Sequence, residues 1–228
     1  MPNEVNLRRI AAVPAQLAEF VVRAGGAFAE RLWARPIASV DDLSVFVGQR
    51  SSLVAQTTLY GYLKTRMGTK FVRYFEDEVF SAGIKEAAVR QFLSCASDLS
   101  IHAAAVVADN GRLERDAAAG LARRCFATAT AQGLEDVEPR TIPPDMREAF
   151  AVRAGRTVWA SAASGEAAFA GSIEDLIRNA PVVDEFKVQD APIVRNSIRF
   201  RWLDVRKELG KRLDPGAVAD DWTTDESH

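Results

Sequence analysis

The sequence predicts an all-α protein that folds as a single irregular bundle of about six to eight helices. The main observation is a nearly continuous stretch over residues 41–109, in which apolar residues recur at spacings of three and four. A second observation is the scarcity of strict apolar–polar alternation, the pattern that strands show. A third is another long helical pattern over residues 192–213.

The N-terminal region predicts an amphipathic helical arm over residues 1–36. Within it, residues 14–33 predict a helix whose apolar positions fall on one stripe: Leu17, Phe20, Val21, Ala24, Phe28 and Leu32. The residue before a proline is pushed out of the helical region, so Arg35 followed by Pro36 ends the segment.

The central region predicts the long helices of the bundle domain, residues 37–213. Ser39 with Asp42 resembles a capping box, so a helix is expected over residues 40–67, stopped by Gly68. A short aromatic helix over residues 70–80 and longer helices over residues 81–109 and 113–132 follow. Arg50 falls on the apolar stripe of the helix expected over residues 40–67. We therefore predict that Arg50 is a structural polar residue of the core and needs a partner there.

The second half of the bundle predicts shorter helices over residues 144–154 and 172–179, after a proline-rich loop at 134–144. Residues 157–171 are rich in small residues and predict neither helix nor strand clearly. Residues 182–190 fit either an extended segment or a helical turn. The last helix is expected over residues 192–213. Residues 214–228 have the composition of an acidic disordered tail.

Composition excludes several classes of protein. Hydrophobic residues make up 48% of the chain and charged residues 26%, which is typical of a globular protein, and the net charge of −2 gives no global signal for nucleic acid. The two cysteines predict reduced thiols rather than a disulfide framework. There is no signal-peptide pattern and no apolar stretch of about 18 residues. We expect a cytoplasmic protein, with peripheral association at the inner membrane as a further possibility.

The catalytic candidates are Cys95, Asp98 and His102, which lie three and four residues apart on one helix face. Asp98 would orient His102 as a general base, or the two would supply ligands to a metal. A metal site needs three or four ligands, so we predict no metal and no cofactor. The structural alternative is that Asp98 accepts a hydrogen bond from His102 or pairs with Arg50.

The binding candidates are on the C-terminal helix. Residues 191–213 carry a local charge of about +5 and residues 214–228 about −5. A basic line beside an apolar stripe predicts a surface for anionic lipid, an acidic partner or phosphate, which the acidic tail would shield; the alternative is a solvated helix face. The residues assigned to this surface are Arg195, Arg199, Trp202 and Arg206.

An aromatic run predicts either ordinary core or a pocket for a small apolar ligand. Its members are Tyr60, Tyr62, Phe71, Tyr74, Phe75 and Phe80.

Two strings, residues 59–68 (LYGYLKTRMG) and 196–202 (NSIRFRW), resemble segments of an uncharacterised family of alphaproteobacterial all-helical proteins. The resemblance covers about residues 15–213 and implies a helical fold. Some members are labelled "esterase", but the family supplies no catalytic residues to carry over. The chain also lacks the G-x-S-x-G nucleophile elbow, the phosphate-binding glycine loops and any C-x-x-C.

These observations favour a non-catalytic interaction or assembly protein, acting at the inner membrane face or on a membrane-associated complex. Two alternatives remain: a hydrolase on a small ester or lipid that uses Asp98 and His102, and a nucleic-acid-linked regulator that uses the basic C-terminal helix. We expect a protein partner or complex, with an anionic membrane surface and a small apolar ligand as further candidates. Nucleic acid is disfavoured as a partner.

Overall fold

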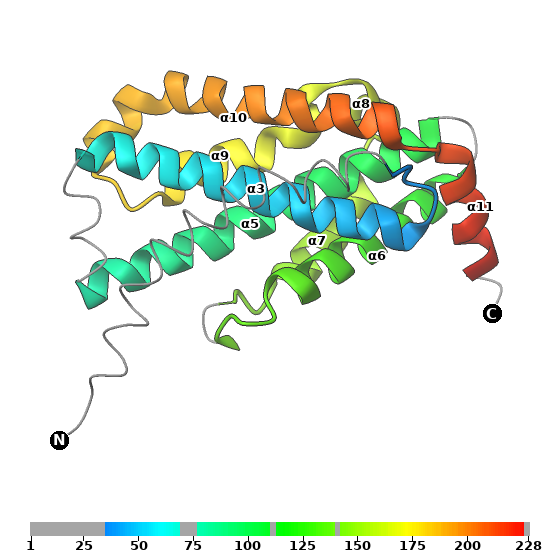
Figure 1. Cartoon of the computed structure of the whole chain (residues 1–228), viewed down its shortest axis with the longest axis horizontal. Coiled ribbons are helices and arrows are strands. Elements are labelled where there is room, and N and C mark those ends of the chain that lie inside the picture. Colours follow the sequence, from blue (N-terminus) through cyan, green and yellow to red (C-terminus); the bar gives the residue numbers. More distant parts are fainter. Residues whose placement is uncertain (1–34, 69–76, 110–112, 140–141, 226–228) are drawn as a thin grey trace.

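A computed structural model describes residues 35–68, 77–109, 113–139 and 142–225. The predicted all-α fold is confirmed: these residues form eight α-helices and one 3-10 helix, and they contain no strand (Figure 1). The elements are α3 (Val40–Met67), α5 (Glu78–Val107), α6 (Arg115–Gly133), α7 (Met146–Arg156), α8 (Trp159–Ser164), η4 (Glu166–Phe169), α9 (Ala170–Asn179), α10 (Asp184–Arg212) and α11 (Pro215–Asp225).

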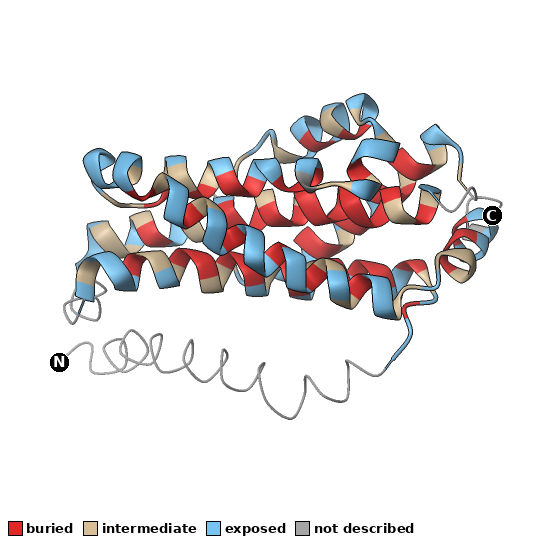
Figure 2. Ribbon diagram, turned by 90° about the horizontal axis from the view of Figure 1, so that it is seen from above, coloured by how far each residue is buried: buried red, intermediate tan, exposed pale blue. Residues whose placement is uncertain are grey.

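Helix α5 is the centre of the bundle. It packs against α3, α6, α8 and α9, while α10 lies across α3 and α9 (Figure 1). Figure 2 shows that the buried residues of the long helices face one another inside the bundle. The second half of α5 is buried almost continuously, and its alanines at 103–105 let neighbouring helices approach closely. Polar residues in this half of α5 therefore need partners within the protein.

Helix α3 has the bounds that the sequence predicted. The Ser39 side chain accepts a hydrogen bond from the Asp42 backbone N–H at 3.1 Å, which satisfies one of the free donors of the first turn. Gly68 ends the helix with φ of 56°, a value that favours glycine. Local sequence signals therefore determine both ends of this helix.

Helix α5 begins at Glu78 because the Asp77 side chain caps it, accepting from the Phe80 N–H at 3.0 Å. The start predicted at residue 81 was therefore slightly late. Most of the short aromatic helix predicted at 70–80 lies outside the described residues, and so does the N-terminal arm up to residue 34.

Helix α10 begins about two turns before the predicted residue 192, and it settles residues 184–190 as helical. Pro192 lies inside the helix, where its missing N–H leaves the Val188 carbonyl without a helical donor. Val188 is exposed, so water can satisfy that carbonyl. The early turns are held by an ion pair between Asp190 and Arg66 of α3, whose guanidinium also lies 4.5 Å from the Phe186 ring centroid.

The prediction of a disordered tail is wrong for the described part of residues 214–228. Helix α11 packs against the end of α3 and α5, where Val218 and Trp222 are buried. Asp214 caps α11 by accepting from the N–H groups of Gly216 and Ala217, and Asp221 accepts from the Val40 N–H at 2.8 Å. These carboxylates stabilise helix N-termini, which carry partial positive charge, so Asp214 and Asp221 are not available to shield α10.

None of the described helices combines the length and the apolar character needed to cross a bilayer.

Candidate functional site

The three catalytic candidates lie on α5, and all are buried in the bundle. Asp98 and His102 do not bond to each other: within the described residues their hydrogen bonds go to different partners. Asp98 does not face Arg50 either. Cys95 and Asp98 meet in one polar network, because Gln91 contacts both the Cys95 Sγ and the Ser172 carbonyl, and the Ser172 N–H donates to Asp98. His102 bonds outside this network, to the Ala162 carbonyl.

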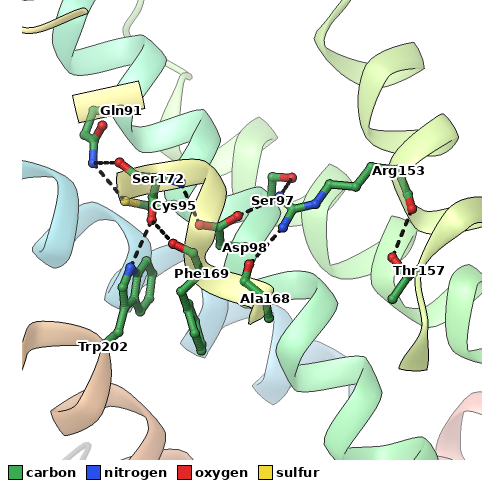
Figure 3. A network of polar contacts seen from close by, with 10 residues as sticks. All are labelled: Gln91, Cys95, Ser97, Asp98, Arg153, Thr157, Ala168, Phe169, Ser172 and Trp202. Carbon is green, nitrogen blue, oxygen red and sulfur yellow. Dashed lines mark hydrogen bonds and ion pairs between the residues drawn. The ribbon is translucent and has the colours of Figure 1, made fainter. Parts of the chain in front are cut away.

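Asp98 belongs to a buried polar network that joins α5, α7, α9 and α10 and the 3-10 helix η4 (Figure 3). One carboxylate oxygen accepts from the Ser172 N–H at 2.7 Å, and the other forms an ion pair of 2.6 Å with Arg153 of α7. Arg153 also donates to Ser97 Oγ and to the Ala168 carbonyl. Burial raises the pKa of Asp98 above the usual carboxyl value, against the opposing effects of Arg153 and Ser172.

The position of Asp98 explains why a carboxylate is buried here. Helix α9 begins after Phe169, whose side chain cannot accept a capping hydrogen bond. Asp98 reaches the first turn of α9 from α5 and supplies the missing acceptor at a helix N-terminus. Gly171 permits this approach, because a Cβ there would lie 2.7 Å from Asp98 Oδ1. Asp98 is therefore a capping residue between helices.

His102 is held as a neutral side chain. Its Nδ1 lies 2.9 Å from the Ala162 carbonyl, and a carbonyl only accepts, so Nδ1 carries the proton. The ring packs against Phe169 with centroids 4.9 Å apart. Burial lowers the pKa of His102, and the charge of Arg206 lowers it further, although the bond to Ala162 opposes this.

Cys95 is fully buried, and burial raises the pKa of its thiol well above the usual value. The charges of Asp98 and Asp175 act in the same direction. Because the thiolate is the nucleophilic form, a thiol held protonated in the core is chemically inert.

Arg50 is buried on α3, and its partner is Glu208 of α10 at 2.6 Å. Arg212 binds the same Glu208 oxygen at 2.6 Å, and both guanidinium groups lie near the Phe46 ring. The predicted pairing with Asp98 is therefore wrong. The Arg50–Glu208 pair joins α3 to α10, which gives the predicted polar core residue a role in holding these two helices together.

The predicted arginines lie along one edge of α10, beside α8 and α9. Arg195 pairs with Glu174 of α9, and Arg206 donates to the Ser164 carbonyl of α8 at 3.5 Å. Arg199 is exposed next to them. The side chains of Arg195 and Arg206 therefore already connect α10 to its neighbours.

Trp202 does not belong to a surface. Its exposed fraction is 2%, its Nε1 donates to Ser172 Oγ at 3.0 Å, and its ring stacks on Phe169 at 4.6 Å (Figure 3). Its assignment to the binding residues is wrong, because the side chain points into the network around Asp98.

The side of α10 that points away from the bundle carries a surface that the sequence interpretation missed. Large apolar side chains are exposed here: Ile193 at 71%, Phe200 at 68% and Leu203 at 41%. They alternate with exposed polar and charged residues at spacings of three and four, so they share one helix face. We call this surface the outer face of α10; it consists of Ile193, Asn196, Phe200, Leu203, Asp204, Lys207 and Lys211.

Neither of two depressions in the described part of the protein is lined by Cys95, Asp98 or His102. The one between α9 and α10 measures about 10 Å³, room for roughly one water molecule, and is lined partly by Arg199 and Arg206. The other measures about 170 Å³ and lies between α3, α5 and the end of α6. Tyr60 lines it, but Phe71, Tyr74 and Phe75 of the predicted aromatic pocket lie outside the described residues.

In the ranges that the structure covers, no group of three or more His, Cys, Asp and Glu residues is arranged to hold a metal ion.

Compared with protein-family models, curated proteins and solved structures, the chain shows no significant match. The resemblance to the alphaproteobacterial family therefore stays a prediction.

Sequence reasoning missed Arg153, Ser172 and Glu208, the partners of the buried charges. No local signal could have found them, because they come from other helices. The outer face of α10 had a signal: Phe186, Ile193 and Phe200 recur at intervals of seven, a spacing that places them on one side of a helix.

Proposed function

We propose that this is a non-catalytic interaction protein that docks on an anionic membrane surface through the outer face of α10. The observation that carries the proposal is the exposure of Ile193, Phe200 and Leu203 beside Lys207 and Lys211. Among the described helices, α10 carries more exposed large apolar side chains than any other.

The chemistry of this face fits an anionic lipid surface. Amphipathic helices bind in the interface by inserting apolar side chains at the headgroup boundary, while lysines and arginines attract anionic lipids. Ile193, Phe200 and Leu203 would supply the apolar contact. Lys207 and Lys211 on the same face, with Arg199 beside it, would supply the charge. The nearby carboxylate of Glu208 is paired with Arg50 and Arg212. The exposed carboxylate of Asp204 lies on the face itself, where the two lysines outnumber it.

Flotation of the full chain with phosphatidylglycerol-containing vesicles at low salt tests the proposal, with pure phosphatidylcholine vesicles for comparison. We expect binding to the anionic vesicles only, and its loss at high salt. Lys207→Glu should weaken binding at least roughly tenfold, because each basic residue near an anionic surface contributes about 1 kcal/mol and the substitution reverses a charge.

Matched variants distinguish binding through the outer face of α10 from non-specific association with vesicles. Phe200→Ser should weaken binding, whereas Val158→Ser, at an equally exposed apolar residue that is not part of α10, should leave it unchanged. Lys85→Glu, at an exposed lysine on α5, is the control for charge. Absence of binding at low salt, or equal loss in the control variants, would refute the membrane proposal.

The two alternatives draw less support. The hydrolase hypothesis needs an accessible base, whereas His102 and Asp98 are buried and already bonded. The nucleic-acid hypothesis needs basic side chains that can contact phosphate groups. Arg195 instead pairs with Glu174 of α9, and Arg206 donates to the Ser164 carbonyl of α8. A steep dependence of nucleic-acid binding on salt would revive it.

A further inference from the structure

The larger of the two depressions lies where α6 ends. Helices α3, α5 and α6 pack against one another, and α3 approaches α6 so closely that a Cβ on Gly48 would lie 3.5 Å from the Ala129 Cβ (Figure 1). About one turn further along, α6 stops at Gly133, whereas α3 continues to Met67. Side chains of α3 and α5 therefore border a space that α6 does not fill, and its volume is about 170 Å³.

Small residues and one fixed ring shape this depression. Ala55 and Ala88 line it from α3 and α5, at positions where a longer side chain would fill the space. The Phe92 ring lies against the end of α6, and a Cβ on Gly133 would be only 2.7 Å from Phe92 Cε1. Glycine at position 133 therefore allows the ring to lie against α6 and to form one wall of the depression.

The volume corresponds to one aromatic ring. A cavity of about 150 Å³ lined by apolar side chains accommodates benzene, so about 170 Å³ has room for such a ring with a small substituent. Pockets for drug-sized ligands and cofactors typically measure about 300–1,000 Å³. The depression is therefore too small to enclose a nucleotide or a fatty acid.

The wall that α3 contributes is polar. Ser52, Gln56 and Tyr60 line the depression at spacings of four, so they lie on one face of the helix. Gln56 Nε2 donates to Ser52 Oγ at 3.1 Å, which leaves the Gln56 carbonyl oxygen to accept. Burial raises the pKa of Tyr60, so its hydroxyl stays protonated and can donate. This wall therefore offers both an acceptor and a donor to a ligand.

The other walls are apolar. Val89 and Phe92 line the depression from α5, and Leu134 and Val137 line it from the turn after α6. Among the described residues, no charged side chain lines it. An ion taken out of water without a partner is costly, so the depression favours a neutral molecule.

We infer that this depression binds one neutral molecule with a single aromatic ring and a hydroxyl group, of the size of phenol. The ring packs against Phe92 and Leu134, while the hydroxyl donates to the Gln56 carbonyl oxygen and accepts from the Tyr60 hydroxyl. No residue of α10 lines the depression, so this inference does not rest on the proposed membrane docking.

Titration of the full chain with 4-fluorophenol, followed by fluorine NMR, tests the inference. We expect saturable binding at one site with a Kd of about 1 mM or tighter, a modest affinity for a ligand of this size. Fluorobenzene, which lacks the hydroxyl, should bind roughly three- to tenfold more weakly. The charged 4-fluorobenzoate should bind at least roughly tenfold more weakly than 4-fluorophenol.

Two variants locate the site. Ala88→Leu fills the depression and should weaken the binding of 4-fluorophenol at least roughly tenfold. Ala149→Leu, the same substitution at an exposed position of α7, should leave it unchanged. Gln56→Leu removes the acceptor with little change in volume, so it should weaken 4-fluorophenol roughly three- to tenfold and leave fluorobenzene unchanged or tighter.

Thermal melts by circular dichroism check that each variant keeps the fold, and the Gln56→Leu comparison stands even if Ala88→Leu does not fold. Absence of saturable binding to the wild type would overturn the inference. Equal affinities for the three ligands, or wild-type affinity for 4-fluorophenol in Ala88→Leu, would overturn it as well. If Gln56→Leu weakens 4-fluorophenol and fluorobenzene to the same extent, the contact between Gln56 and the hydroxyl is refuted.

Discussion

Replacement of Gly171 by alanine tests the capping role of Asp98. Gly171 is in the first turn of α9, and a Cβ there would lie 2.7 Å from Asp98 Oδ1 and 3.4 Å from the Arg153 guanidinium. The first of these distances is too short for a carbon atom beside an oxygen. Asp98 or the start of α9 must therefore shift, and the shift weakens the bond from the Ser172 N–H.

The expected cost follows from the contacts that change. Overpacking a dense site costs about 1–3 kcal/mol, and a hydrogen bond to a charged group contributes about 1.5–3 kcal/mol. The helix propensity of alanine returns up to about 1 kcal/mol. We expect Gly171→Ala to lower the free energy of unfolding by about 2 kcal/mol, which corresponds to a fall in Tm of about 4–8 °C for a chain of this length.

Urea unfolding monitored by circular dichroism measures this change. Gly61→Ala is the matched control, because no atom lies within 4 Å of a Cβ there and the substitution should stabilise α3 by up to about 1 kcal/mol. In an Asp98→Ala background the close contact is absent, so Gly171→Ala should be neutral or stabilising by up to about 1 kcal/mol. A Gly171→Ala protein as stable as the wild type would refute the close approach of Asp98 to α9.

Two further predictions concern His102 and the C-terminal helix. Burial lowers the pKa of His102 in the folded protein below its unfolded value of 6.5, so its contribution to stability is complete above pH 6.5 and is lost as the pH falls through the folded pKa. Between these two pKa values, the difference in free energy of unfolding between the wild type and His102→Asn should change by up to about 1.4 kcal/mol per pH unit. Urea midpoints of the two proteins that stay parallel across this pH range would contradict the prediction. Trp222→Ala should lower the free energy of unfolding by about 3 kcal/mol, because the indole is buried against the bundle. Thr224→Ala, on the exposed side of α11, should change it by less than about 0.5 kcal/mol. Thermal melts in which both variants keep the Tm of the wild type would mean that α11 does not pack on the bundle.

The sequence by itself determined the helical class and the ends of the best-marked helices. Ser39 and Gly68 act on backbone groups within a few residues, so the bounds of α3 could be read directly. The face shared by Cys95, Asp98 and His102 was also predictable, because helical periodicity is local. For the same reason the sequence indicated that Arg50 lies on a buried stripe.

Only the tertiary structure decided what these side chains do. Arg50 is paired with Glu208, 158 residues away, and Asp98 with Arg153 of another helix, so no local pattern identifies either partner. Composition predicted disorder for residues 214–228, although Trp222 is buried against the bundle. Composition counts apolar residues, but it does not show which of them pack against other helices. Helix periodicity acts within a few residues, whereas the neutralisation of a buried charge depends on which helices meet. The sequence therefore located the polar residues, and the packing of the helices made Asp98 a cap, His102 a neutral core residue and the outer face of α10 a candidate docking surface.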